Sequence, residues 1–482
     1  MSVLGHLTPA SVFQYFEALC AIPHGSYNTA AIADFCVNFA KEHGFDYYRD
    51  DANNVIIRKP ATPGYEKSGT VILQGHTDMV CEKDPGSAFD FATDGIELIL
   101  EGDTIRANGT TLGADNGIAV AMCFAILTDD AVEHPALEVL LTSDEEVGML
   151  GAFALDCSQL KGKTLINIDS EEEGIITCSC AGGANAYSTI PVQFEEAELA
   201  LVEVDLGSMC SGHSGAEIHK WRANANVLLA RMLYALNTKF DCRIVKLEGG
   251  TRETAIAAVG SAAFGVPAAQ LDAAAAEAAA LAAAFKKEYA TAEPTMEITV
   301  KTAPAAAVSA LTAADTAKLA NVLVALPDCV QVMSVDMPGL VQTSVNFGIL
   351  RLRENEVFFS NTVRSSVATQ KQWILDKVCA IVAIAGGKTE ISGSYPGWSY
   401  NPHSAIKDTI VRVYRDLFGK EASVEAIHAG LECGLFADAI EGLDCVSIGP
   451  NMGDVHTPRE YLSVASTART YKLVCEILRS MK

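Results

Sequence analysis

The sequence has few basic residues and no long apolar segment. Among its 482 residues, 35 Lys and Arg stand against 60 Asp and Glu, a formal net charge of −25 at pH 7. Nucleic acids and anionic lipid surfaces are bound through surplus Lys and Arg, so this balance argues against both kinds of partner. No apolar run reaches the roughly 18 residues that a membrane-spanning helix requires.

The features of a secreted chain are also missing. The N-terminal segment has no basic region followed by an apolar core. Thr8 and Pro9 instead have the residue types of a helix N-cap and a first helical position, ahead of helical spacing over residues 12–19. Of the 14 cysteines, only Cys178 and Cys180 stand close together, and no second pair completes a metal site. We therefore expect reduced, buried thiols in a cytoplasmic protein.

The outer parts of the chain have the pattern of an α/β domain. Hydrophobic residues make up 49% of the sequence, which is enough for a large core. Short apolar runs that end in polar residues alternate with helical periodicity, which predicts a mixed, largely parallel sheet. The predicted strands are Thr70–Gln74, Leu137–Leu141, Thr164–Ile168 and Asp444–Ile448, and the predicted helices include Gly117–Leu127 and Ala405–Phe418.

The middle of the chain has a different pattern, with longer strand-like segments and two helical stretches. The strand-like segments are Leu201–Asp205, Met296–Lys301, Thr343–Gly348 and Glu356–Asn361; the helical stretches are 223–236 and the Ala-rich 268–289. This pattern predicts an α+β domain over 186–392, inserted into a discontinuous catalytic domain formed by 1–185 and 393–482.

Acidic and imidazole groups follow the carboxyl ends of the predicted strands. In open α/β sheets, ligands bind outside these ends, so we expect the groups to converge on one crevice. The segments are Gln74–Asp78, Thr142–Gly148, Asn167–Glu173 and Ile448–Pro458, together with Leu112–Gly117, which opens a helix. The consecutive glutamates 171–173 have the pattern of a solvated charge run.

The residue types in these segments suit a metal-dependent hydrolase. Histidine and carboxylate ligands without cysteine favour zinc, manganese or cobalt over a redox centre. The spacing of His76 and Asp78 lets the carboxylate orient the imidazole. Of the adjacent Glu145 and Glu146, one can bind metal while the other acts as general base. A carboxylate between two ions would complete a two-metal site, in which bound water ionises near neutral pH.

The motifs resemble those of the co-catalytic zinc exopeptidases, a superfamily that includes glutamate carboxypeptidases and succinyl-diaminopimelate desuccinylase. Within it, the chain is most similar to the bacterial aminoacyl-histidine dipeptidases, the Xaa-His or peptidase D type that includes carnosine-splitting enzymes. The resemblance spans nearly the whole chain. It rests on Gly75–Val80, Gly113–Ile118, Asp144–Gly148, Asn167–Asp169, Gly212–His219 and Gly453–His456.

The resemblance implies a role for each matching residue. His76 and Asp169 would hold one divalent ion, Glu146 and His456 a second, and Asp115 would bridge the two. Asp78 would orient His76, and Glu145 would be the general base.

The resemblance also extends into the inserted domain, which would act as a lid. His213 corresponds to the histidine that polarises the scissile carbonyl, although Ser211 stands where the family often has glycine. Arg364 corresponds to the arginine that binds the terminal carboxylate of the substrate. Asn346 and Gly430 are weaker matches to pocket residues. The role of His219 is left open, and the family permits a homodimer.

Three functions remain to be distinguished at this point. The favoured one is a two-metal dipeptidase acting on unblocked dipeptides. The alternative is an N-acyl amino acid deacylase or desuccinylase on the same scaffold, which a panel of free and blocked substrates would separate. A catalytically silent binding protein is disfavoured, because every predicted ligand and the predicted base are present.

Overall fold

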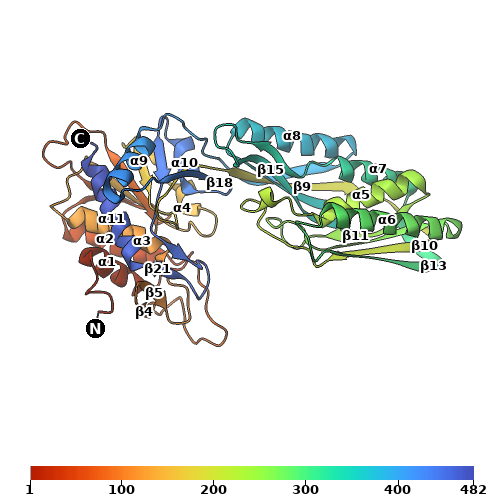
Figure 1. The fold of residues 1–482 in the computed structure, drawn as a ribbon, viewed down its shortest axis with the longest axis horizontal. Helices are drawn as coiled ribbons and strands as arrows, with labels where there is room; N and C mark the ends of the chain where they lie inside the picture. Colours follow the sequence, from red (N-terminus) through yellow and green to blue (C-terminus); the bar gives the residue numbers. More distant parts are fainter. Residues whose placement is uncertain (1) are drawn as a thin grey trace. The chain divides into compact units, whose positions relative to one another are not determined.

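The structure is a computed structural model that describes residues 2–482, and the chain forms two compact units (Figure 1). Unit 1 comprises the chain up to Ser179, Tyr400–Ala426 and Leu431–Lys482. Unit 2 comprises Cys180–Ser399 and the short segment Ile427–Gly430. The sequence pattern gave no sign that this short segment belongs with unit 2.

Unit 1 is built on an eight-stranded mixed sheet in the order β1-β2-β6-β3-β7-β19-β8-β18. The neighbours β6, β3, β7 and β19 run parallel, while β1, β2 and β8 are antiparallel to their neighbours. This arrangement confirms the predicted α/β class. The strands are β1 (Asp46–Arg49), β2 (Val55–Lys59), β3 (Val71–His76), β6 (Leu137–Thr142), β7 (Thr164–Asn167), β8 (Ile175–Cys180), β18 (Ser423–Ile427) and β19 (Asp444–Ser447). A smaller sheet contains β4 (Leu98–Glu101), β5 (Thr104–Ala107), β20 (Met452–Gly453) and β21 (Tyr461–Ser463).

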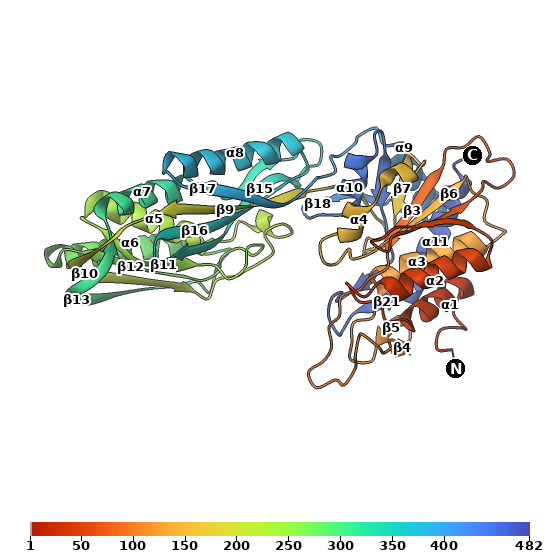
Figure 2. The ribbon, with the colours of Figure 1, turned by 180° about the vertical axis from the view of Figure 1, so that it is seen from behind.

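Helices cover both faces of this sheet (Figure 2). One layer contains α1 (Ala10–Cys20), α2 (Ala30–Glu42), α3 (Ala114–Thr128), α9 (Ala405–Phe418) and α11 (Val464–Arg479). The opposite face carries α4 (Leu150–Ala154), the 3-10 turn η1 (Cys157–Gln159) and α10 (Glu432–Ala439). Helix α3 is apolar on all sides because it lies between the sheet and α1, and residues 116–127 are buried.

The predicted start of the first helix is wrong by one residue. Helix α1 begins at Ala10, and no side chain caps its N-terminus. Pro9 is the N-cap, because its backbone is extended (ψ 130°) and so lies outside the helix. Thr8 is therefore not the cap.

Unit 2 contains a nine-stranded sheet whose neighbouring strands all pair antiparallel. Its strands are β9 (Gly182–Pro191), β10 (Phe194–Gly207), β11 (Arg243–Gly249), β12 (Gly260–Val266), β13 (Glu297–Leu311), β14 (Cys329–Met333), β15 (Val341–Leu352), β16 (Glu356–Ser365) and β17 (Lys388–Tyr395). Its helices are α5 (Ala225–Lys239), α6 (Leu271–Glu288), α7 (Ala313–Ala325) and α8 (Ala368–Ile384), with the 3-10 turns η2 (Ile218–Lys220) and η3 (Ala268–Gln270). These four helices pack on the sheet around one apolar core (Figure 1).

Two further sequence expectations can be compared with the structure. Cys178 and Cys180 are buried in β8, as expected for core residues. Over residues 2–482, none of the helices has both the length and the apolar character needed to cross a membrane.

Candidate metal centre

The predicted ligand segments of unit 1 meet at one edge of its sheet. His76 is the last residue of β3, and Asp169 and Glu146 follow the ends of β7 and β6. Because these strands are parallel neighbours, their carboxyl ends lie side by side. Asp115 comes from the first turn of α3, and His456 from the loop after β20.

Two imidazoles and three carboxylates face one another at this edge. His76 Nε2 lies 3.1 Å from Asp115 Oδ1 and 3.5 Å from Asp169 Oδ1. His456 Nε2 lies 3.2 Å from Asp115 Oδ2 and 3.0 Å from Glu146 Oε1. Each oxygen of Asp115 therefore faces a different imidazole. His76, Asp115 and Glu146 each offer a ligand atom, and these atoms lie within 4.8 Å of one another.

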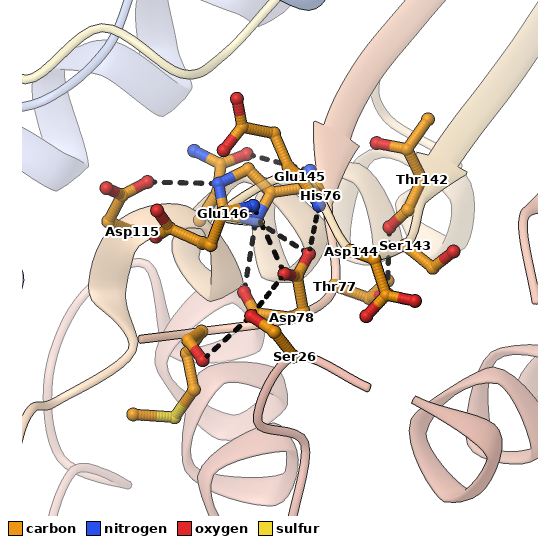
Figure 3. A network of polar contacts seen from close by, with 12 residues as sticks. Ser26, His76, Thr77, Asp78, Asp115, Thr142, Ser143, Asp144, Glu145 and Glu146 are labelled. Carbon is orange, nitrogen blue, oxygen red and sulfur yellow. Dashed lines mark hydrogen bonds and ion pairs between the residues drawn. The ribbon is translucent and has the colours of Figure 1, made fainter. Parts of the chain in front are cut away.

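Asp78 connects His76 to the loop that carries the two glutamates (Figure 3). The Nδ1 atom of His76 lies 3.0 Å from the backbone carbonyl of Asp78 and 3.4 Å from its carboxylate. This leaves Nε2 to face the other carboxylates. The Asp78 carboxylate also accepts the backbone N–H groups of Glu145 (2.9 Å) and Glu146 (3.3 Å) and the hydroxyl of Ser26 (2.8 Å).

The approach of α3 to β3 depends on a glycine next to the first histidine. A Cβ atom at Gly75 would collide with the side chains of Asn116 and Ala119. Asn116 accepts the backbone N–H of His76 (3.2 Å) and donates to the carbonyl of Ile168 (2.7 Å). The peptide bond between Asp115 and Asn116 is cis.

The electrostatics of the centre favour a bound cation. Burial raises the pKa of Asp169 to about 7, and burial with nearby like charges raises the pKa of Glu145 well above its usual value. Hydrogen bonds that the protonated imidazole donates to Asp115 and Glu146 raise the pKa of His456 to about 10. Asp169 Oδ1 is buried without a hydrogen-bond partner in the described chain. Buried carboxylates need a compensating positive charge, and this oxygen and imidazole donor set fits divalent ions.

Sequence reasoning missed a buried glutamate beneath the centre. Glu432, at the start of α10, accepts the side chains of Gln74 (2.6 Å) and Thr142 (2.8 Å), and Gln74 in turn accepts Asn167. These three partners lie on β3, β6 and β7, the strands that carry metal-centre segments. No local spacing marks Glu432, because its partners are hundreds of residues away in the chain.

The glutamate run after β7 is only partly solvated. Glu171 and Glu172 are exposed. Glu173 instead receives two 2.6 Å hydrogen bonds from the guanidinium of Arg469 on α11. The prediction of a solvated run is therefore wrong at Glu173, because an oppositely charged side chain lies next to it in the fold.

Unit 2 brings together the residues predicted to bind substrate. His213 Nδ1 accepts the N–H groups of Gly215 (3.3 Å) and Ala216 (3.1 Å), and its Nε2 lies 3.3 Å from Arg364 Nη2. Arg364 donates to the Tyr395 hydroxyl (3.0 Å), and its Nε is buried without a partner in the described residues. A Cβ atom at Gly215 would meet both His213 and Arg364, so this glycine allows their close approach.

The remaining predicted residues of this unit have different surroundings. Asn346 donates to the carbonyls of Glu253 (2.9 Å) and Ala255 (3.0 Å), so its amide holds the segment in which Ala255 pairs with His213. Gly430 ends the segment Ile427–Gly430. His219 is exposed on η2.

The segment that ends at Gly430 also contains a buried histidine. His428 is buried, and its Nε2 lies 2.7 Å from the Ser344 hydroxyl. Burial and the charge of Arg364 lower the pKa of His428 to about 3, so the imidazole stays neutral beside the guanidinium.

One imidazole and two carboxylates at the carboxyl ends of parallel strands, together with Asp115 and His456, suit a metal-dependent hydrolase. Residues 72–480 match the family model "Peptidase family M20/M25/M40", and the chain belongs to this family of metallopeptidases. It is 37% identical over 483 residues to the cytosol non-specific dipeptidase of Escherichia coli (strain K12), covering 100% of this chain and 99% of the relative.

Solved structures agree with this assignment. The crystal structure of aminoacylhistidine dipeptidase from Vibrio alginolyticus has a TM-score of 0.94 and 35% identity, covering 100% of this chain and 98% of that chain. The aminopeptidase PepT from Bacillus cereus has a TM-score of 0.58 at 16% identity, covering 98% and 99%, and so shares the fold. The resemblance to co-catalytic metallopeptidases is confirmed.

Proposed function

We propose that this protein is a dipeptidase that hydrolyses unblocked dipeptides of the Xaa-His type, including carnosine-like substrates, with two divalent metal ions. The observation that most directly supports two ions is the orientation of Asp115. Its two oxygens lie 3.1 Å from His76 and 3.2 Å from His456, as expected of a bridging carboxylate. Two relatives that match the full chain are named dipeptidases, which supports the substrate class.

The ligand assignment follows the directions of the side chains. His76 and Asp169 would hold one ion and Glu146 and His456 the other, with Asp115 shared between them. Zinc is the first expectation, with manganese and cobalt as alternatives, because all three accept imidazole and carboxylate ligands. When bound, the ions would polarise the scissile carbonyl as Lewis acids and would lower the pKa of a bound water molecule.

Glu145 and Asp78 complete the chemistry on unit 1. Glu145 accepts the proton of the attacking water and passes it to the leaving amine. The Asp78 carboxylate lies 3.4 Å from Nδ1 of His76 and accepts the backbone N–H of Glu145, so this one carboxylate orients both the proposed ligand and the proposed base.

Unit 2 provides the groups that bind the substrate. His213 donates from Nε2 to the oxyanion that develops on the scissile carbonyl, because its Nδ1 already accepts two backbone N–H groups. Arg364 pairs with the terminal carboxylate of the dipeptide, which would satisfy its unpartnered Nε. Asn346 and Gly430 line this pocket. The inserted domain over 186–392 acts as the lid, and turnover requires either closure of that domain or a contribution from a neighbouring subunit.

The proposed cellular location and partners of the enzyme rest on the same comparisons and on the composition of the chain. We place it in the cytoplasm, since the Escherichia coli relative is named a cytosol enzyme and the cysteines are thiols. The net charge of −25 argues against a nucleic-acid partner. A homodimer is the proposed assembly.

The test is hydrolysis of an Xaa-His dipeptide panel by chelated and metal-restored protein, with N-acetylated versions alongside. We expect cleavage of the free dipeptides only, lost on chelation and restored by Zn²⁺, Mn²⁺ or Co²⁺. Preference for the acetylated compounds would replace the dipeptidase with a deacylase. Absence of metal-dependent cleavage of either set would refute a hydrolase function.

A further inference from the structure

Glu460 is a buried carboxylate with an unusual number of backbone donors. It is 3% exposed and lies at the N-terminus of α3. One oxygen accepts the N–H groups of Leu112 (2.7 Å) and Gly113 (3.1 Å). The other accepts those of Ala114 (2.9 Å) and Asp115 (3.3 Å). Four consecutive backbone N–H groups thus point at a single side chain.

These donors belong to the helix start that carries Asp115. Within α3 the backbone of Asp115 (ψ 100°) and Asn116 (φ −120°) is not helical, so the N–H groups that precede the regular part of the helix have no partners inside it. Buried N–H groups need an acceptor, and the Glu460 carboxylate provides it. Gly113 precedes the helix with a left-handed backbone (φ 72°), which turns its N–H toward the carboxylate. The backbone of Asp115 is therefore held by Glu460 while its side chain faces the two imidazoles.

The same glutamate closes the loop that carries His456. The Glu460 N–H donates to the carbonyl of Thr457 (3.0 Å), and the Thr457 hydroxyl donates to the carbonyl of Asp454 (2.7 Å). His456 lies within this turn, with a left-handed backbone (φ 61°). One residue therefore joins the turn of His456 to the helix start of Asp115, which are far apart in sequence.

We propose that Glu460 is a positioning residue of the metal centre, which sets the separation between Asp115 and His456. It does not touch the ions. Its carboxylate fixes the backbone of one ligand, and its own main chain fixes the turn of the other. This inference rests on the proposed two-metal function, since it concerns how two of its ligands are held.

The substitution Glu460→Gln tests the role at nearly constant volume. The amide keeps one acceptor oxygen but presents an NH₂ group to backbone donors, so at least two of the four hydrogen bonds are lost. Removal of a group that orients metal ligands typically lowers metal affinity by about 10–100-fold. We expect a loss of this size for at least one of the two ions.

Glu138 supplies a matched control in the same unit. It is also buried, and it accepts the backbone N–H groups of Lys161 (2.9 Å) and Gly162 (2.9 Å). It lies on β6 near the amino end of that strand, whereas the metal centre lies beyond the carboxyl end. Glu138→Gln therefore makes the same chemical change in a buried carboxylate away from the ligands.

The full-length variants and the wild-type protein are stripped of metal. Their Zn²⁺ affinity is then measured by competition with a chromophoric chelator, and their Co²⁺ spectra are recorded. Urea unfolding of the metal-free proteins measures how much each substitution lowers the free energy of unfolding. We expect both variants to lose stability, while only Glu460→Gln binds Zn²⁺ more weakly and shows an altered Co²⁺ spectrum.

Two results would overturn the proposal: Glu460→Gln binding Zn²⁺ within twofold of wild type, or Glu138→Gln weakening Zn²⁺ binding as much. If the Gln variants do not fold, the comparison is made with Glu460→Asp and Glu138→Asp, whose shorter side chains keep the charge. A wild-type protein that binds no divalent ion would refute the proposed function itself, which separates that failure from a failure at Glu460.

Discussion

The backbone N–H of Glu145 donates a 2.9 Å hydrogen bond to the carboxylate of Asp78. The same carboxylate lies 3.4 Å from Nδ1 of His76. A residue two positions after a proposed metal ligand thus also positions the loop of the proposed base. The same carboxylate therefore orients the proposed ligand His76 and the proposed base Glu145, and substitutions at Asp78 should affect both.

Replacing Asp78 tests this link. Asp78→Asn keeps the shape but weakens the hold on His76 and the glutamate loop, so we expect metal affinity to fall by about 10–100-fold and kcat to fall as well. Chelator competition and steady-state kinetics measure the two effects. Ser26→Ala removes only one hydroxyl donor to Asp78 and should change either quantity less than Asp78→Asn does. Equal effects of the two substitutions would contradict the orienting role.

Removing the proposed base should separate catalysis from metal binding. Glu145→Ala is expected to lower kcat by about 10²–10⁴-fold, because a general base typically contributes that much. Elemental analysis should find the metal content unchanged. Glu172→Ala, at an exposed carboxylate, is the control and should retain activity. Near-normal kcat in Glu145→Ala would rule out the base assignment.

The bridging role of Asp115 predicts a change in stoichiometry. Asp115→Ala removes the carboxylate that faces both imidazoles, so fewer than two ions should remain per chain after dialysis. Asp130→Ala changes an exposed carboxylate just beyond the other end of α3 and should leave two. Elemental analysis of both variants measures the number of ions bound per chain. Two ions retained in Asp115→Ala would eliminate the bridging role.

Metal removal should destabilise unit 1, because its buried carboxylates then repel one another without compensation. Ligand binding to the native state alone adds about 4 kcal/mol at a free ligand concentration of 1,000 Kd. Thermal unfolding should therefore show a higher Tm for the Zn²⁺-restored protein than for the chelated protein. Asp115→Ala should show a smaller difference. Identical Tm values with and without chelator would argue against metal at this centre.

The neutral state of His428 predicts a pH effect on stability. Its pKa is lowered to about 3 in the fold, against about 6.5 for an unfolded histidine. The unfolded chain then binds the extra proton, so stability is present above pH 6.5 and is lost as pH falls toward 3. Between pH 7.5 and 5 this loss amounts to about 2 kcal/mol, at 1.36 kcal/mol per pH unit below 6.5.

Denaturant unfolding of wild type and His428→Gln at the two pH values measures this contribution. The variant should lose less stability on acidification. His403→Gln removes an exposed imidazole and should follow wild type. If His428→Gln loses as much stability as wild type, the buried neutral imidazole is not the source of the pH dependence.

Local patterns were sufficient for much of the fold. The predicted helix Ala405–Phe418 matches α9, and the three apolar runs at 70–74, 137–141 and 164–168 correspond to β3, β6 and β7. Periodicity succeeds here because it reports which face of an element is buried. It failed at Thr8, where the backbone of Pro9 decides the helix start.

The residues of the candidate site also divide into those that the sequence pattern marked and those that it did not. Strand-end placement marked His76, the pair Glu145 and Glu146, and the segment that contains Asp169, because the ends of parallel strands are neighbours wherever the sheet forms. The resemblance to the family then selected Glu146 and Asp169 as ligands. Glu432 and Glu460 were not predicted, because their hydrogen-bond partners lie 290 to 358 residues away in sequence. No local spacing encodes such a distance.

The sequence by itself determined the donor types of the centre, the strand ends that carry them and the acidic character of the chain. These properties depend only on residue identity and on the spacing of apolar residues, which repeat every two to four positions along strands and helices. Only the tertiary structure decided that the two oxygens of Asp115 face different imidazoles, that Asp78 holds both His76 and Glu145, and that Glu460 joins two ligand segments. Such directions are set when helices and strands pack, because packing fixes through-space distances between residues that the chain leaves far apart.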